Sequence, residues 1–70
     1  MTNEEEKEFA ESFGFTAIAD PKRGKGWYKY QKKDTYVWAC SAGWGVAELI
    51  EGRFCNHRYY VTLANALEEP

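Results

Sequence analysis

Residues 27–40, WYKYQKKDTYVWAC, contain the clearest structural pattern in this chain. Aromatic and β-branched residues alternate with polar ones on both sides of a polar centre, a pattern typical of two antiparallel strands joined by a tight turn. We therefore predict strands over Gly26–Lys32 and Thr35–Cys40, with residues 32–34 (KKD) in the turn.

The turn also predicts which side chains share a face of the sheet. A two- or four-residue loop around Lys33-Asp34 places Tyr30 opposite Val37, and directly opposed residues lie on the same face. That face is apolar, so we expect it to meet the helices. The other face mixes rings with a lysine, and it carries Trp27, Lys29 and Gln31 on the first strand and Tyr36, Trp38 and Cys40 on the second.

Further elements extend outward from this hairpin. A third strand is predicted over Trp44–Glu51, and the pair Glu51-Gly52 allows a tight turn into a fourth strand near Arg53–Asn56. Upstream, residues 21–26 (PKRGKG) form a loop because of their proline and glycine content. Phe15–Asp20 is either a short extended piece or irregular.

The N-terminus is predicted to be helical. Thr2 and Glu5 have the spacing of a capping box, and an acidic first turn suits the positive end of a helix dipole. Phe9 and Phe13 share a face, and Gly14 stands where a left-handed glycine would end the helix. We expect the glutamates at positions 4, 5, 6, 8 and 11 to form a solvated helix face, with an acidic interaction arm as the alternative.

The C-terminus is predicted to be a second helix, because apolar residues at positions 60, 63, 64 and 67 have the spacing i, i+3, i+4, i+7. Its N-cap is either Asn56 or Thr62. The chain is then one α+β domain over residues 1–70, in the order α-β-β-β(-β)-α. We expect a small antiparallel sheet of three or four strands with both terminal helices packed mainly on one face.

The chain is small and rich in aromatic residues. Seventy residues lie near the lower limit for a self-sufficient hydrophobic core, yet the chain has 3 Trp, 5 Tyr and 4 Phe. A core of this size is too small to cover all these rings, so we expect some to face water or a partner. The opening residues MTNEEEKEF lack the pattern of a secretory signal and no apolar run is long enough for a membrane span, so we expect a cytoplasmic protein.

The residue types that carry catalysis or bind metals are sparse. Cys40, Cys55 and His57 are too few for a structural zinc site and lack a C-x2–4-C pair, so we expect reduced thiols, no metal and no cofactor. The PKRGKG loop lacks the phosphate-loop pattern. Glu48 would be a functional candidate with a raised pKa if it faced inward, and we expect it to face outward. No catalytic residue is assigned, and the chain is not expected to be an enzyme.

The candidate binding surface is the mixed face of the first hairpin with the basic loop beside it. Six of the nine positive charges lie in Lys22–Asp34, although the whole chain has a net charge of -2. We expect a protein partner to bind, and be inhibited or regulated, through Trp27, Lys29, Tyr36, Trp38, Lys22, Arg23 and Lys25.

Two alternatives use the same surface. In the first, the rings stack on RNA or DNA bases, single-stranded or double-stranded, while Lys32, Lys33, Arg53 and Arg58 extend the cationic side. The acidic overall charge argues against it. In the second, the sheet face is the interface of a homodimer. No membrane partner is expected.

The α-β-β-β-α order and the length resemble those of the double-stranded-RNA-binding domain. That family opens its last helix with a lysine cluster, whereas the matching region here, Asn56 to Asn65, has only His57 and Arg58. In its size and aromatic content the chain also looks like the small accessory proteins of phages and mobile elements. Those proteins often act by binding and blocking a host or defence protein, as anti-CRISPR inhibitors do, although no motif carries this likeness.

Overall fold

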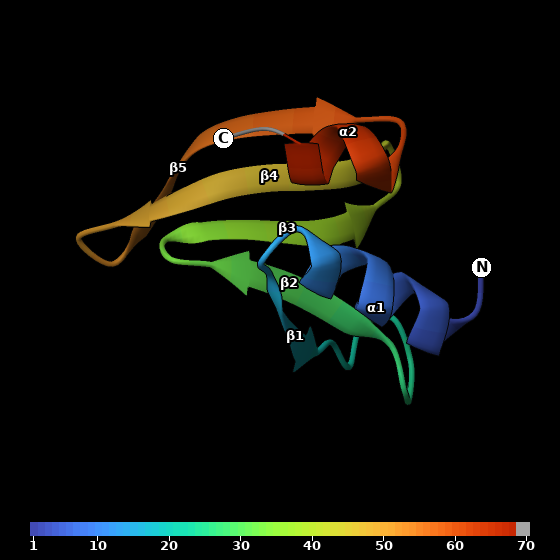
Figure 1. Ribbon diagram of the computed structural model, residues 1–70. Coiled ribbons are helices and arrows are strands. Elements are labelled where there is room, and N and C mark those ends of the chain that lie inside the picture. Colours follow the sequence, from blue (N-terminus) through green and yellow to red (C-terminus); the bar gives the residue numbers. More distant parts are fainter. Residues whose placement is uncertain (69–70) are drawn as a thin grey trace.

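A computed structural model describes residues 1–68 of the chain (Figure 1). Two helices and a five-stranded antiparallel sheet follow one another in the order α1-β1-β2-β3-β4-β5-α2. The helices are α1 (Asn3–Ser12) and α2 (Leu63–Glu68), and the strands are β1 (Thr16–Ala19), β2 (Tyr28–Lys32), β3 (Thr35–Cys40), β4 (Gly43–Ile50) and β5 (Arg53–Tyr60). Neighbours in sequence are neighbours in the sheet, so the strands form a simple meander.

The predicted α+β class is confirmed, with both helices on the same face of the sheet (Figure 1). The central hairpin also forms as predicted: Tyr30 pairs with Val37, and the two-residue turn places Lys33 in the left-handed region with φ 54°. Within the described residues no helix is long and apolar enough to cross a membrane.

The sheet has more strands than the sequence indicated. The segment after α1 is a true strand, β1, which pairs with β2, and the fourth predicted strand becomes the eight-residue β5. The helical assignment of Tyr60 is therefore wrong. Tyr60 pairs with Trp44 on β4 and packs against the core, so strand pairing overrides its helical spacing. Thr62 caps α2 instead, since its Oγ1 accepts a hydrogen bond from the Asn65 N–H at 3.2 Å.

Local signals fix the ends of α1 as predicted. Thr2 and Glu5 form the capping box, in which each side chain accepts the other's backbone N–H. At the other end Gly14 has φ 89°, and the Phe15 N–H reaches the Ala10 carbonyl at 3.2 Å. This is a Schellman ending, and it folds the buried Phe15 back onto the helix.

The hydrophobic core lies between the helices and one sheet face. Tyr30, Val37 and Val46 are the largest fully buried side chains, and they come from the three central strands. Helix residues complete the core, with Ala10 from α1 and Leu63, Ala66 and Leu67 from α2. The opposite sheet face, called the open face below, has neither α1 nor α2 over it (Figure 1).

A β-bulge interrupts the last strand pair. Val46 lies opposite Arg58 and Glu48 lies opposite Cys55, so β5 has one residue more than β4 over this interval. Asn56, inside the interval, has φ 58°. A bulge of this kind shifts the alternation of side chains by one position, so residues on either side of Asn56 can point to the same face.

Candidate interaction surface

Five rings gather on the open face. Tyr36 and Trp38 lie on β3, and Phe54, His57 and Tyr59 lie on β5. These five residues are called the aromatic patch below. Phe54 and Tyr59 are 52% and 58% exposed, which is high for such large side chains. The patch therefore presents aromatic surface to the solvent.

The rings meet because the strand between them carries small residues on this face. Gly45 on β4 pairs with Trp38 on one side and with Tyr59 on the other. A Cβ at Gly45 would lie 2.5 Å from the Trp38 ring, so the indole lies directly over this glycine. The Trp38 and Tyr59 ring centroids are 6.5 Å apart at 86°, an edge-to-face contact.

Two further edge-to-face contacts join rings of the patch. The rings of Tyr36 and Phe54 have centroids 5.3 Å apart at 88°, and those of Trp38 and His57 are 6.1 Å apart at 80°. Such pairs add about 0.5–1.5 kcal/mol each beyond the area that they bury. The aromatic patch is therefore preformed.

A shallow open pocket of about 430 Å³ lies over this patch. Its wall combines four patch rings, Tyr36, Trp38, Phe54 and His57, with Lys29 on β2 and the loop residues Asp20, Pro21 and Lys22. The Asp20 carboxylate is buried, and its Oδ1 accepts the Lys22 N–H at 3.2 Å. Asp20 thus shapes the loop, and the lysines supply the exposed charge at the rim.

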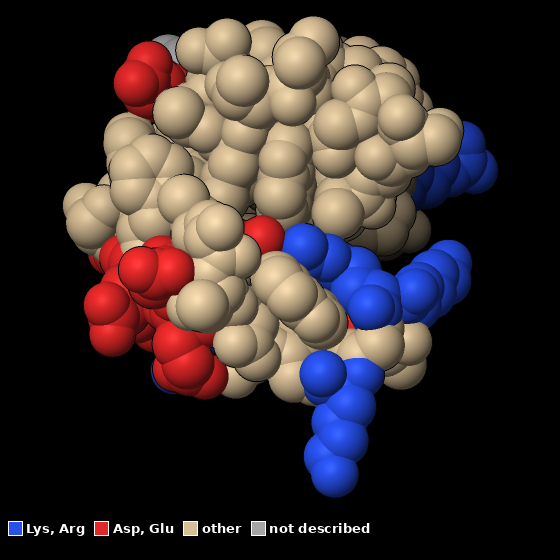
Figure 2. All heavy atoms as spheres, turned by 90° about the vertical axis from the view of Figure 1, so that its right-hand side faces the viewer, with Lys and Arg blue, Asp and Glu red and all other residues tan. Residues whose placement is uncertain are grey.

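On the side of the molecule drawn in Figure 2, charges of opposite sign mostly lie apart. Figure 2 shows Asp and Glu gathered towards the left, the side on which the helices lie, and Lys and Arg gathered towards the right. The first turn of α1 alone carries Glu4, Glu5 and Glu6. The net negative charge of the whole chain therefore does not give the sign of the charge near the pocket, where Lys22 and Lys29 lie.

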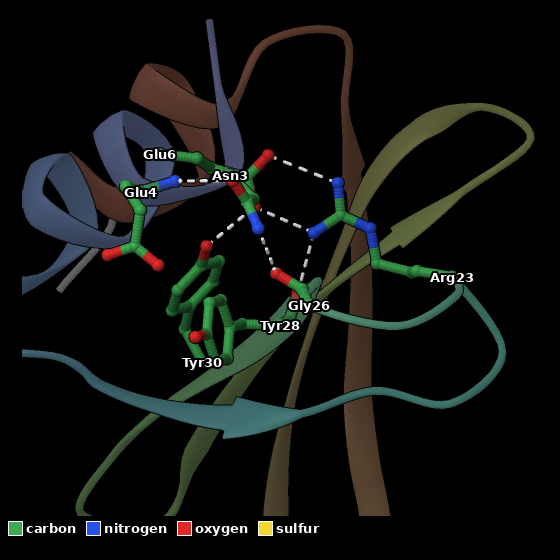
Figure 3. A network of polar contacts seen from close by, with 7 residues as sticks. All are labelled: Asn3, Glu4, Glu6, Arg23, Gly26, Tyr28 and Tyr30. Carbon is green, nitrogen blue, oxygen red and sulfur yellow. Dashed lines mark hydrogen bonds and ion pairs between the residues drawn. The ribbon is translucent and has the colours of Figure 1, made fainter.

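One glutamate of α1 is not solvated, contrary to the prediction for that helix face. Glu6 is 5% exposed and accepts three hydrogen bonds inside the protein (Figure 3). Arg23 Nη1 and Nη2 donate to its two carboxylate oxygens at 2.7 and 3.1 Å, and the Tyr30 hydroxyl donates at 2.5 Å. Arg23 also donates to the Tyr28 carbonyl at 2.6 Å.

This network changes the titration of its members. Burial, and next the hydrogen bond to Glu6, raise the pKa of Tyr30 far above its ordinary value. The hydrogen bond to Glu6 raises the pKa of Arg23 in the same way. Both groups therefore keep their protons at neutral pH, and the network links α1, the basic loop and the centre of the sheet.

Arg23 also organises two of the three tryptophans. Its guanidinium lies 4.7 Å from the Trp27 ring centroid and 5.1 Å from that of Trp44, so the cation contacts both rings. Trp44 packs against the core. The structure thus brings Trp27 to Arg23 at the end of the sheet, whereas Lys22, Lys29, Tyr36 and Trp38 come together at the pocket.

The remaining cations of the candidate surface have different surroundings. Lys32 Nζ donates to the Phe13 carbonyl at the end of α1 at 3.0 Å. Lys25 is exposed in the basic loop, Lys33 lies in the hairpin turn, and Arg53 is exposed at the start of β5. Arg58 Nη2 is 2.7 Å from Glu48 Oε2. These residues do not form one continuous cationic stripe with the pocket lysines.

Glu48 lies in this ion pair rather than in an apolar environment. The Arg58 guanidinium, and next the Asn56 amide, donate to its carboxylate and hold its pKa below the ordinary range. The raised pKa considered for an inward-facing functional carboxylate is therefore not found.

The two cysteines lie at opposite ends of the sheet. Cys40 pairs with Gly43 at the β3–β4 turn, whereas Cys55 pairs with Glu48 near the other turn. Both thiols are free, and residues 1–68 contain no group of three or more His, Cys, Asp or Glu placed to hold a metal ion.

The sequence prediction missed the contribution of β5 to the surface. Phe54, His57 and Tyr59 were not assigned to it, because the fourth strand was expected to end at Asn56. A usable signal was present in the small residues Gly45 and Ala47, which alternate along β4 and leave room for rings from both neighbouring strands.

Comparisons with protein-family models, with curated proteins and with solved structures found no match to this chain.

Proposed function

We propose that the protein is a non-enzymatic recognition module that binds a protein partner through the aromatic patch and inhibits or regulates it by covering its surface. One observation carries the proposal: five rings from β3 and β5 gather on a sheet face that neither helix covers. Tyrosine, tryptophan and phenylalanine are enriched at protein interfaces, and tryptophan and tyrosine at their energetic centres.

The geometry suits binding by a rigid surface. The rings stand on β3 and β5, which both pair with β4 between them, and they contact one another edge to face, so few side chains must be ordered when a partner arrives. Because little conformational entropy of the side chains is lost on binding, more of the favourable contact energy contributes to the affinity. This mechanism needs no catalytic group and no cofactor.

The arrangement of the rings favours a protein over nucleic acid. Stacking bases requires ring faces that are separately accessible, whereas the patch rings make edge-to-face contacts with one another. Arg23 and Lys32, two of the six charges in the basic stretch, bind to Glu6 and to the end of α1. These two side chains are therefore already engaged within the protein, and fewer cations of the basic stretch remain to bind phosphate groups.

The test is affinity capture from an extract of the source cells, treated with nuclease and performed with matched variants. Trp38→Ala and Phe54→Ala remove patch rings. Ile50→Ala removes an exposed apolar side chain that strand alternation places on the other sheet face, and it is the matched control. Circular dichroism verifies that each variant folds, and the half-exposed Phe54 gives a variant that costs little core packing.

We expect a protein that the wild type and Ile50→Ala retain and that both patch variants lose. With the purified partner, Trp38→Ala should weaken the affinity at least about 30-fold, the value that corresponds to an interface hot spot of about 2 kcal/mol. Equal capture by the patch variants would refute the proposal. A doubled mass by light scattering that Trp38→Ala abolishes would show instead that the patch is a homodimer interface.

A further inference from the structure

The pocket on the open face combines two kinds of surface. Its lining includes the aromatic residues Tyr36, Trp38 and Phe54 and the basic residues Lys22 and Lys29. A lining that combines aromatic rings with lysines matches a ligand that places an apolar side chain next to negative charge.

The charges around the pocket also favour a negatively charged ligand. Asp20 also lines the pocket, but its carboxylate is buried and accepts the Lys22 backbone N–H, so an incoming ligand reaches it less easily than the exposed Lys22 side chain. The glutamates of α1 lie on the helix side of the sheet, and on the side of the molecule drawn in Figure 2 acidic and basic side chains mostly stand apart. A negatively charged partner is therefore attracted to Lys22 and Lys29 and repelled by the acidic first turn of α1.

The pocket lysines also differ from the other cations of the basic stretch. Arg23 is held by Glu6, and Lys32 by the Phe13 carbonyl, whereas no side-chain hydrogen bond or ion pair of Lys22 or Lys29 is recorded within the described residues. Both pocket lysines are therefore placed to pair with a partner.

We infer that the partner presents an acidic segment, in which an aromatic or aliphatic side chain enters the pocket and neighbouring carboxylates pair with Lys22 and Lys29. This inference rests on the proposed function and specifies the chemistry of its partner. The apolar side chain supplies most of the affinity, and the carboxylates supply orientation and discrimination against basic surfaces.

Three short peptides test the inference on the intact protein by nuclear magnetic resonance. EDEFEDE carries an apolar anchor between acids, EDEGEDE lacks the anchor, and KKKFKKK has the opposite charge. We expect EDEFEDE to shift the Trp38 indole and Lys29 amide resonances with a low-millimolar Kd, a range that titration to about 5 mM detects. EDEGEDE and KKKFKKK should bind at least about fivefold more weakly.

Matched variants distinguish the effect of the pocket lysines from the effect of the overall charge of the protein. The double variant Lys22→Gln with Lys29→Gln should weaken EDEFEDE about fivefold, as expected for two exposed ion pairs. Lys7→Gln removes a positive charge from α1, on the other side of the sheet, and should leave the affinity unchanged.

Several results would overturn the inference. These are no shift with EDEFEDE, equal shifts with KKKFKKK, or an unchanged affinity in the double lysine variant. Tighter binding of a 15-residue oligothymidine to the same resonances, with a steep dependence on salt, would identify nucleic acid as the partner instead. Failure of the peptides while Trp38-dependent capture persists would refute only the acidic partner, whereas peptide binding without any captured protein would refute the proposed function.

Discussion

Glu6→Gln tests whether the buried network of α1 is needed for stability. The substitution keeps the size of the side chain but removes its charge. The new amide oxygen, placed where Oε1 lies, can still accept from Arg23 Nη1 and the Tyr30 hydroxyl, but the NH2 group then faces the Arg23 Nη2 donor and that hydrogen bond is lost. The Arg23 side chain, 17% exposed, then lacks its counter-charge.

The magnitude follows from these contacts. Breaking a fully buried ion pair by removing one partner costs about 3–5 kcal/mol. Here Arg23 keeps its bond to the Tyr28 carbonyl and some solvent contact, so we expect a loss of about 2–3 kcal/mol. For a domain of this size that loss lowers Tm by about 10–20 °C.

The assay is denaturant unfolding followed by circular dichroism, with thermal unfolding in parallel. Glu8→Gln makes the same chemical change at an exposed position of the same helix, and its stability should stay within about 0.5 kcal/mol of the wild type. If Glu6→Gln and Glu8→Gln unfold at the same denaturant concentration, the network does not stabilise the fold and the reasoning fails.

Three further predictions concern the open face and β5. Gly45→Ala puts a methyl group 2.5 Å from the Trp38 ring, so it should cost about 1–3 kcal/mol in denaturant unfolding and move the indole N–H resonance. Asn56→Val and Asn56→Gly both lose the hydrogen bond to Glu48, but only valine puts a β-branched residue at φ 58°, so denaturant unfolding should show Asn56→Val less stable than Asn56→Gly by about 1–2 kcal/mol. Glu48→Gln removes a carboxylate whose pKa Arg58 lowers below the ordinary 4.5, so the variant should be less stable than wild type at pH 7, and the difference should vanish as the pH falls below that value.

Each of these results can contradict its premise. An unchanged indole resonance in Gly45→Ala would mean that Trp38 does not lie over the glycine. Equal stability of the two Asn56 variants would argue against the left-handed bulge. For Glu48, the folded-state pKa is depressed, so the stabilisation exists above the unfolded-state pKa and is lost as the pH falls through the folded-state value. A difference that persists at low pH would assign the effect to packing instead.

The parts of the fold that short-range interactions control were predictable. The ends of α1 depend on Thr2, Glu5 and Gly14, whose partners lie within five residues along the chain, and these were assigned correctly. The pairing of Tyr30 with Val37 followed from the turn between them, because the side-chain period of a strand is two and a short turn fixes the register.

The errors arose where a distant residue decides the outcome. Glu6 looked like its exposed neighbours, since the partner that buries it, Arg23, lies 17 residues further along the chain. Tyr60 had helical spacing with α2, yet its pairing with Trp44 on β4 holds it in a strand. Local propensity carries no information about such partners, and tertiary contacts override it.

The candidate surface likewise has one part that depends on short-range interactions and one part that depends on distant residues. That Tyr36 and Trp38 share a face with Lys29 could be read from residues 29–38, because all three belong to one hairpin whose register is local. Phe54 and Tyr59 join them through pairing between strands that are not visible in any one segment of the chain. Strict alternation puts these two residues on opposite faces of β5, and the bulge at Asn56 brings them to the same face. The bulge is a feature of the pairing between β5 and β4, and β4 comes from another part of the chain, so residues 53–60 alone do not specify it.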